Sequence, residues 1–403
     1  MNRRNLIVGV AATAIGLAGL TGTAKAAEPV KVGELFSYAR IAAFADPYRS
    51  GWQLAIEEIN DAGGVLNGRP IEVISRDDGG TTADAVRVAE ELVSREDVAF
   101  LFGTFFSNIG LAVADFAKQR EVLFIAAEPL SDALTMAQGN AYTFRMRPNT
   151  YMQTGMLVDE AAKLGKTRWA IVAPNYEYGQ AAAANFKKLA EEKMPGAEII
   201  IEQYPALGKI DAGATVQAIL QANPDGIFNA LFAGDLAKFV REGQTRGLFE
   251  DRTVLSLLTG EPEYLDPMKD EAPEGWIVTG YPWYDIDNPI HDRFVAAYQE
   301  KYGDSPRLAS LLGYTIGYAI KAMLDKAGST DTDQMIAALE GLNMSTPIGP
   351  MTMRAIDNQS SLGAFVGTIA VKDGKGVMVD WRYADGADYM HPEAEVKAAR
   401  GDQ

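Results

Sequence analysis

The chain has 403 residues, of which 47% are hydrophobic and 23% charged, and it contains no cysteine. This length and apolar content exclude a fibrous, disordered or disulfide-stapled chain and predict two globular lobes, because single domains rarely exceed about 300 residues. The 54 acidic residues against 37 basic ones give a net charge of −17, which argues against nucleic acid as a partner. With two histidines and no cysteine, the sequence predicts no metal and no other cofactor.

Residues 1–26 have the pattern of a removable secretory signal. Arg3 and Arg4 precede an apolar run of small residues, and Ala24-Lys25-Ala26 supplies the small residues that signal peptidase recognises. A membrane anchor would need about 20 strongly apolar residues, and neither this run nor any later segment provides them. The sequence therefore predicts an exported chain that begins at residue 27 and has no stable membrane insertion.

The first part of this exported chain alternates strands with amphipathic helices. Strands are predicted at 30–36, 70–77, 98–102 and 122–127, and helices at 47–62, 82–95 and 109–120. Such alternation is typical of a parallel sheet with helices on both faces. We expect this stretch to form the core of a first α/β lobe.

The alternation restarts after residue 149 and predicts a second lobe. Its helices are expected at 150–164, 179–192, 211–222 and 235–246, and its strands at 168–173, 197–203, 226–230, 253–257 and 276–279. A third stretch adds helices at 291–302, 309–327 and 333–340, strands at 363–372 and 377–383, and a polar tail that we expect to fray. Residues 27–148 with 282–363 are assigned to lobe 1, and 149–281 with 364–403 to lobe 2, which requires more than one crossing between them.

Ligands of open parallel sheets bind outside the carboxyl ends of the strands. Two facing lobes would therefore form a cleft lined by the loops that follow the strands. These loops are 37–46, 103–109, 126–131, 174–179, 231–235 and 258–263.

No motif of a known catalytic machinery is present. The sequence has no GxSxG, GxxxxGK[ST], GxGxxG or HExxH, so we expect no enzyme. The alternative is an exported hydrolase that uses Glu261 and Glu263 as acid and base.

The predicted loops are rich in hydroxyl and aromatic residues. Ser107 stands where a helix is expected to begin, as a plain N-cap, as a ligand-binding hydroxyl, or as both. Tyr176 and Tyr178 stand at a second such junction, where they either pack against neighbours or touch a ligand. The loops also contain aromatic rings that either line the cleft or belong to the core, namely Phe44, Phe105, Phe106 and Phe232.

Several segments of the chain resemble the periplasmic leucine/isoleucine/valine-binding protein family. The resemblance rests on Ala55-Ile-Glu-Glu-Ile-Asn60, Asp61-Ala-Gly-Gly-Val-Leu-Asn-Gly-Arg-Pro70, Asp77-Asp78-Gly79 and Tyr142-Thr-Phe-Arg-Met-Arg-Pro148. It implies a type I periplasmic binding protein fold, with two doubly wound α/β lobes whose central parallel sheets are joined by a three-crossing hinge. It further implies a periplasmic protein that closes on a small-molecule ligand and docks on the permease subunits of an ABC transporter.

The resemblance also assigns ligand-binding residues. Ser107 matches a serine that meets the ligand carboxylate, Tyr178 matches a tyrosine of the second lobe, and Glu261 matches the glutamate that pairs with the ligand ammonium. Phe44 corresponds to an aromatic residue of the first loop. Phe105 and Phe232 are added as aromatic residues of the candidate loops.

The loop after the fourth strand departs from the family pattern. Ala127, Glu128 and Leu130 stand there; Leu130 replaces a hydroxyl residue, and Glu128 introduces a charge. The resemblance therefore implies capture of an amino-acid-like ligand for an importer, with an amide, an amine or an aromatic carboxylate as alternatives. A sensor subunit that presents its ligand to a receptor has the same sequence features.

Overall fold

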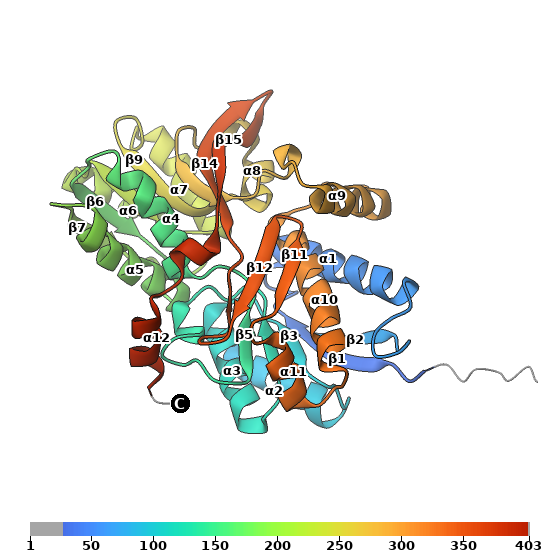
Figure 1. The fold of residues 1–403 in the computed structure, drawn as a ribbon. Coiled ribbons are helices and arrows are strands. Elements are labelled where there is room, and N and C mark those ends of the chain that lie inside the picture. Colours follow the sequence, from blue (N-terminus) through green and yellow to red (C-terminus); the bar gives the residue numbers. More distant parts are fainter. Residues whose placement is uncertain (1–26, 402–403) are drawn as a thin grey trace, which may run out of the picture.

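The computed structural model describes residues 27–401, so the predicted signal segment lies outside the described residues. Two separate sheets organise the described chain, one of eight strands and one of seven. Figure 1 shows them as two lobes with helices packed around each sheet. No helix within 27–401 is long and apolar enough to cross a membrane.

The first sheet has the strand order β11-β12-β13-β5-β4-β3-β1-β2, and β1 to β5 run parallel. Its central strands β3 and β4 are buried along their whole length, as expected for parallel strands covered on both faces. The strands are β1 (Val30–Phe36), β2 (Ile71–Asp77), β3 (Leu101–Gly103), β4 (Phe124–Ala126), β5 (Thr143–Arg145), β11 (Asn343–Thr346), β12 (Gly349–Arg354) and β13 (Gln359–Ser360).

Helices from two distant parts of the chain surround this first sheet. They are α1 (Ala42–Asp61), α2 (Thr82–Ser94), α3 (Ser107–Arg120), η1 (Asp132–Leu134), α9 (Pro289–Tyr302), α10 (Leu308–Ala327) and α11 (Thr332–Leu339). The close approach of α1 and α10 depends on glycine, because a Cβ on Gly313 would meet the carbonyl oxygen of Tyr48. This contact binds the N-terminal and C-terminal parts of the chain into one lobe.

The second sheet has the strand order β15-β14-β10-β9-β8-β6-β7. Five adjacent strands, from β10 to the edge strand β7, run parallel, and the antiparallel hairpin β14-β15 forms the other edge. The strands are β6 (Arg168–Val172), β7 (Glu198–Gln203), β8 (Gly226–Asn229), β9 (Thr253–Gly260), β10 (Ile277–Gly280), β14 (Ala364–Lys372) and β15 (Lys375–Ala384). The helices between them are α4 (Thr150–Ala162), α5 (Glu177–Lys193), α6 (Ala212–Ala222), α7 (Ala233–Thr245), α8 (Pro262–Met268) and η2 (Lys269–Glu271).

The chain passes between the two sheets three times. It leaves the first sheet after β5, returns after β10 through η3 (Trp283–Asp285), and leaves again after β13. The predicted fold of two α/β lobes joined by three crossings is therefore confirmed.

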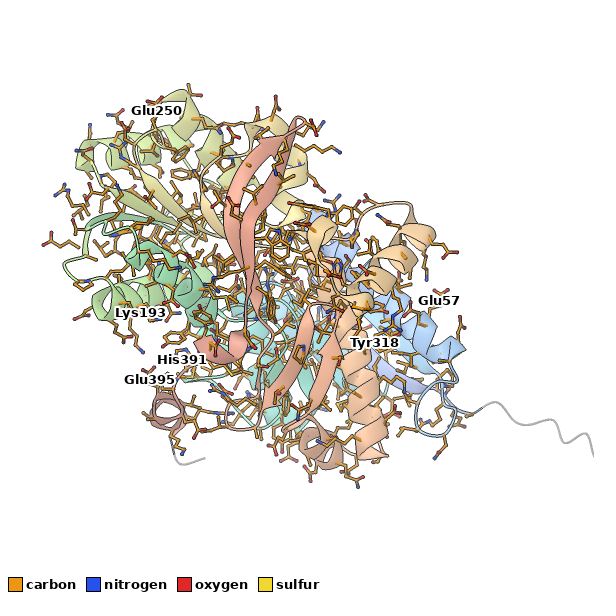
Figure 2. The ribbon with its side chains drawn as sticks, turned by 45° about the horizontal axis from the view of Figure 1, so that its top comes forward. Glu57, Lys193, Glu250, Tyr318, His391 and Glu395 are labelled. Carbon is orange, nitrogen blue, oxygen red and sulfur yellow. The ribbon has the colours of Figure 1, made fainter. Side chains whose placement is uncertain are left out.

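The C-terminal segment is ordered, so the prediction of a fraying tail is wrong. It contains η4 (Gly386–Tyr389) and α12 (Glu393–Arg400). Glu395 pairs with Lys188 of α5 at 2.6 Å, while Arg400 donates to the carbonyl oxygen of Ile356 at 2.7 Å. Figure 2 shows His391 and Glu395 next to each other at this junction. Because the tail contacts both lobes, its assignment to lobe 2, like the other lobe limits, stays a prediction.

Most other predicted elements are present within a few residues of their expected bounds. α1 begins earlier than predicted, at Ala42, and β9 extends to Gly260. The sequence prediction missed β5, β11, β12, β13 and α8, each of seven residues or fewer, because such short segments show no clear periodicity.

Candidate functional site

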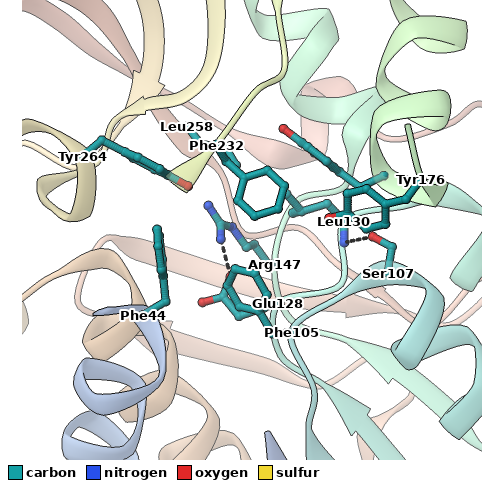
Figure 3. A pocket seen from close by; sticks show the side chains of 11 residues that line it. Phe44, Phe105, Ser107, Glu128, Leu130, Arg147, Tyr176, Phe232, Leu258 and Tyr264 are labelled. Carbon is teal, nitrogen blue, oxygen red and sulfur yellow. Dashed lines mark hydrogen bonds and ion pairs between the residues drawn. The ribbon is translucent and has the colours of Figure 1, made fainter. Parts of the chain in front are cut away.

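A cavity with about 330 Å³ of space not filled by atoms lies between the lobes, where the carboxyl ends of the two parallel sheets face each other. Its wall is mostly aromatic and apolar, with a few polar groups (Figure 3). The lining residues are Phe44, Phe105, Ser107, Glu128, Leu130, Arg147, Tyr176, Tyr178, Phe232, Leu258 and Tyr264.

A row of aromatic rings crosses the cavity from one lobe to the other. The ring of Tyr264 lies 5.3 Å from that of Phe44, and Phe44 lies 5.5 Å from Phe105. Phe105 is 6.3 Å from Phe232, which is 5.9 Å from Tyr178. Because rings of the two lobes contact each other, this is a closed form of the molecule.

Non-glycine residues in the left-handed region flank the cavity. Thr104 has φ 63°, Ala233 has φ 50° and Leu258 has φ 68°. Such conformations cost about 1–3 kcal/mol each and persist where the surrounding fold enforces them. They occur here at the turns that follow β3 and β8 and inside β9, which carry the wall residues.

Three helices begin at the cavity wall without a side-chain cap. These are α3, which starts at Ser107, and α5 and α7, whose N-cap residues are Tyr176 and Phe232. By contrast, Thr81 and Asn149, which do not line the cavity, cap α2 and α4 with their side chains. The first-turn N–H groups of α3, α5 and α7 are thus left for a ligand, and the helix dipoles favour a negatively charged group there.

Ser107 is not the N-cap of α3, so the plain N-cap interpretation is wrong. Phe106 holds that position, and the Ser107 Oγ accepts hydrogen bonds from the backbone N–H groups of Leu130 at 3.2 Å and Ser131 at 3.1 Å. Because the oxygen accepts two bonds, its own proton is left to donate into the cavity. The buried hydroxyl of Tyr178 also has no hydrogen-bond partner among the described residues.

Arg147 stands at the polar end of the cavity between two glutamates. Its guanidinium pairs with Glu128 through one terminal nitrogen and with Glu261 through the other, and all three side chains are at most 6% exposed (Figure 3 shows the pair with Glu128). Burial lowers the pKa of Arg147, but the adjacent carboxylates of Glu128 and Glu261 outweigh burial and raise it. Burial raises the pKa of Glu261 well above its ordinary value in spite of Arg147. Arg147 therefore keeps its charge between the two glutamates.

A second cavity lies behind Arg147, next to the three crossings. It has about 340 Å³ of unfilled space, and its wall includes Pro148, Gly280 and Gly363. Arg147 lines both cavities, whereas Glu261 lines only the second. The guanidinium thus separates Glu261 from the cavity between the lobes.

The structure brings the predicted site residues together at the first cavity, except Ala127 and Glu261. Ala127 is buried after β4, and its N–H donates to the carbonyl oxygen of Gly103 at 2.8 Å, away from the cavity wall. The contact of Glu261 with a ligand ammonium stays a prediction, and in this structure its carboxyl group contacts Arg147 instead. The residues that line the cavity as predicted are Phe44, Phe105, Ser107, Glu128, Leu130, Tyr178 and Phe232.

Three wall residues were not named from the sequence, and a fourth, Tyr176, was named only as a residue that either packs against its neighbours or touches a ligand. Leu258 lies within a predicted loop, and Tyr264 follows directly after that loop. Arg147 was missed because β5 was not predicted, so the residues after it were not recognised as a strand-end loop. Its place just before Pro148, at the start of a crossing, was the available signal.

The family model described as periplasmic binding protein matches residues 35–375 of this chain. The chain belongs to the periplasmic binding protein family. One curated relative is the Leu/Ile/Val-binding protein homolog 7 of Brucella suis. It is 27% identical to this chain, and the match covers 91% of this chain and 94% of the relative. The resemblance noted in the sequence is therefore confirmed.

Solved structures with the same fold include proteins named for different ligands. A solute binding protein of an ABC transporter from Rhodopseudomonas palustris, in complex with 3,4-dihydroxybenzoic acid, has a TM-score of 0.78 and 24% identity and covers 89% of this periplasmic binding protein and 98% of that chain. The leucine-, isoleucine-, valine-, threonine- and alanine-binding protein from Brucella ovis, in its closed conformation, has a TM-score of 0.80 and 20% identity. This match covers 91% of this chain and 97% of that chain. The fold and family are those of binding proteins rather than enzymes.

Proposed function

We propose that this periplasmic binding protein captures a small carboxylate-bearing, amino-acid-like solute between its lobes and delivers it to the permease subunits of an ABC importer in the periplasm. The observation that carries the proposal is the closed cavity, in which three uncapped helix starts and two free hydroxyl donors face an aromatic wall. Donors on a dry, apolar wall are the arrangement that holds the anionic end of a small solute.

The energetics require the aromatic wall. An affinity of about 1 μM corresponds to about −8 kcal/mol, whereas one charge-assisted hydrogen bond contributes about 1.5–3 kcal/mol. Burial of the apolar part of the solute between the closing lobes must therefore supply much of the remainder. A ligand that contacts both lobes also favours the closed form over the open one.

An aromatic carboxylate is the second candidate ligand. Six aromatic rings line the cavity, and the similar protein from Rhodopseudomonas palustris is described in complex with an aromatic acid. Flat rings pack well against edge-on and tilted aromatic neighbours such as these.

The hydrolase alternative has less support. Glu261 pairs with Arg147, and the Glu263 carboxylate accepts the N–H groups of Leu308 at 3.4 Å and Ala309 at 2.8 Å. Both carboxylates thus have partners within the protein and are not poised together on the cavity wall. Turnover of a bound solute by the purified protein would favour the hydrolase instead.

Thermal-shift and calorimetric titration test the binding function with protein purified from the periplasm of the expression host. The panel contains amino acids, amides and aromatic acids. A ligand at about 100 times its dissociation constant adds about 2.7 kcal/mol of stability, so a clear rise in Tm is expected for at least one class. Uptake of that ligand by cells with and without the gene then tests delivery, and unchanged uptake would favour a sensing role.

A further inference from the structure

The position of Arg147 determines which solutes fit the cavity. This side chain is 6% exposed and lies between the cavity and Glu261. Its two terminal nitrogens bind carboxylates of both lobes, Glu128 after β4 and Glu261 after β9. A cation belonging to the protein therefore already occupies the polar end of the cavity.

A ligand ammonium would compete with this fixed cation. To reach Glu261 it would have to displace a guanidinium held by two buried carboxylates, and removing one partner from such a cluster is strongly unfavourable. An ammonium bound beside Arg147 would instead be repelled by its positive charge.

The remaining free groups of the wall are mainly donors. The hydroxyl of Tyr178 is buried and has no hydrogen-bond partner within residues 27–401, and burial raises its pKa, so it keeps its proton. The Ser107 hydroxyl accepts two backbone bonds and has its proton left to donate. Together with the uncapped starts of α3, α5 and α7, these donors fit a carboxylate. The carboxylate oxygen of Glu128 that does not bind Arg147 can accept a hydrogen bond from one neutral donor of the ligand, such as a hydroxyl.

We infer that Arg147 takes the place of a ligand ammonium, so that this protein selects carboxylates without an amino group, with an aromatic or other flat apolar body. This inference rests on the proposed binding function and, between its two candidate ligands, favours the aromatic carboxylate over the amino acid. Arg147 acts as a specificity-determining residue together with Glu128, the charge that departs from the family pattern.

Matched ligand pairs that differ only in the amino group provide the test. Calorimetric titration compares 3-phenylpropanoate with phenylalanine and 4-methylpentanoate with leucine, and benzoate and 4-hydroxybenzoate are added as flat acids. We expect at least one amino-free acid to bind at least tenfold more tightly than its amino counterpart. Equal or tighter binding of phenylalanine or leucine would overturn the inference while leaving the proposed function intact. Absence of binding by every compound would contradict the proposed function itself, and with it the inference.

Two variants test the role of Arg147 directly. Arg147→Met removes the fixed cation and exposes Glu128 and Glu261, so the preference is expected to shift toward the amino compounds by at least tenfold. Glu128→Gln keeps Arg147 and lowers the local negative charge, so the acids are expected to bind at least as tightly as before. This second variant keeps the test decisive if Arg147→Met fails to fold.

Arg120→Met, which removes an exposed arginine of α3 that pairs with Glu90, is the control. An Arg147→Met protein that folds and keeps its original preference, or a Glu128→Gln protein that loses its preference for acids, would overturn the inference.

Discussion

Glu34 is a carboxyl group enclosed within the first lobe. It lies on β1 with no exposure and accepts hydrogen bonds from the Tyr38 hydroxyl at 3.0 Å and the Ser75 hydroxyl at 2.6 Å. Burial raises the pKa of Glu34 to about 8, although both hydrogen bonds act to lower it. The folded protein therefore holds this proton at a pH where the unfolded chain has lost it.

This proton makes the stability depend on pH. Between the ordinary value of 4.5 and about 8 the folded state binds more protons, so the free energy of unfolding falls as the pH rises through that window. Glu34→Gln removes this titrating group. Between pH 5 and 8.5 we expect the free energy of unfolding in urea to fall by about 4 kcal/mol less in Glu34→Gln than in the wild type. Glu72→Gln, at an exposed position of β2, is the control, and parallel curves for wild type and Glu34→Gln would contradict the prediction.

Ser107 supports the wall of the cavity as well as facing it. Ser107→Ala leaves the buried N–H groups of Leu130 and Ser131 without an acceptor. We expect a loss of about 1–3 kcal/mol in the free energy of unfolding by chemical denaturation. Ser94→Ala, which removes an exposed hydroxyl of α2, is expected to have little effect. Equal stability of the two variants would show that the loop does not need this oxygen.

The position of a wall residue at the cleft could be predicted from the sequence where the residue follows a strand that the sequence pattern revealed. Phe105, Ser107 and Phe232 follow buried apolar strands, and this topology brings them to the cleft. Arg147 was not predictable in this way, because β5 has three residues and Arg147 follows it directly into a crossing. The partner of Glu261 was not predictable either, since an ion pair between residues 114 positions apart depends on how the lobes close.

Glycine allows α1 and α10 to pack together at the level of the backbone. Gly313→Ala would place a methyl group against the carbonyl oxygen of Tyr48 and 2.8 Å from the backbone nitrogen of Trp52. Overpacking costs about 1–3 kcal/mol, which exceeds the gain of up to about 1 kcal/mol that alanine brings to a helix interior. We therefore expect a lower Tm by differential scanning calorimetry. Gly234→Ala of α7, where the added methyl group meets open space, should not lower the Tm, and an unchanged Gly313→Ala protein would contradict this account.

Long periodic elements were predictable, and short edge elements were not. α2 and β1 match their predicted bounds closely because their apolar residues repeat with the period of a helix or form a continuous buried strand. β11 and β12 lie at an edge of the first sheet and bury only part of their residues, so their apolar pattern is weak. Half of the residues of α12 are charged, and the helix contacts both lobes through Glu395 and Arg400.

At the scale of the whole molecule, Glu263 of the second lobe binds the first turn of α10 in the first lobe. It lies on α8 of the second lobe, yet its carboxylate accepts N–H groups from Leu308 and Ala309 in the first turn of α10, which packs in the first lobe. The N-cap residue Arg307 provides no side-chain cap of its own to these groups. The contact therefore joins the two lobes in this closed form.

Removing this contact is expected to penalise the closed form selectively. In Glu263→Ala the N–H of Ala309 is expected to stay buried without an acceptor in the closed form, whereas water can accept its hydrogen bond in the open form. This difference is expected to raise the free energy of the closed form relative to the open form by about 1–3 kcal/mol. We expect ligand affinity by calorimetry to fall about 5- to 150-fold, and small-angle scattering to show less compaction with ligand. Glu271→Ala, which removes an exposed partner of Arg241, is the control. Full affinity in Glu263→Ala would show that closure does not depend on this contact.

The last helix contacts both lobes, through Glu395 to α5 and through Arg400 to the loop after β12. Any movement that separates α5 from this loop would break one of the two contacts. A chain shortened after Ala384 is therefore expected to release a bound solute faster than the full chain, although α12 does not line the cavity.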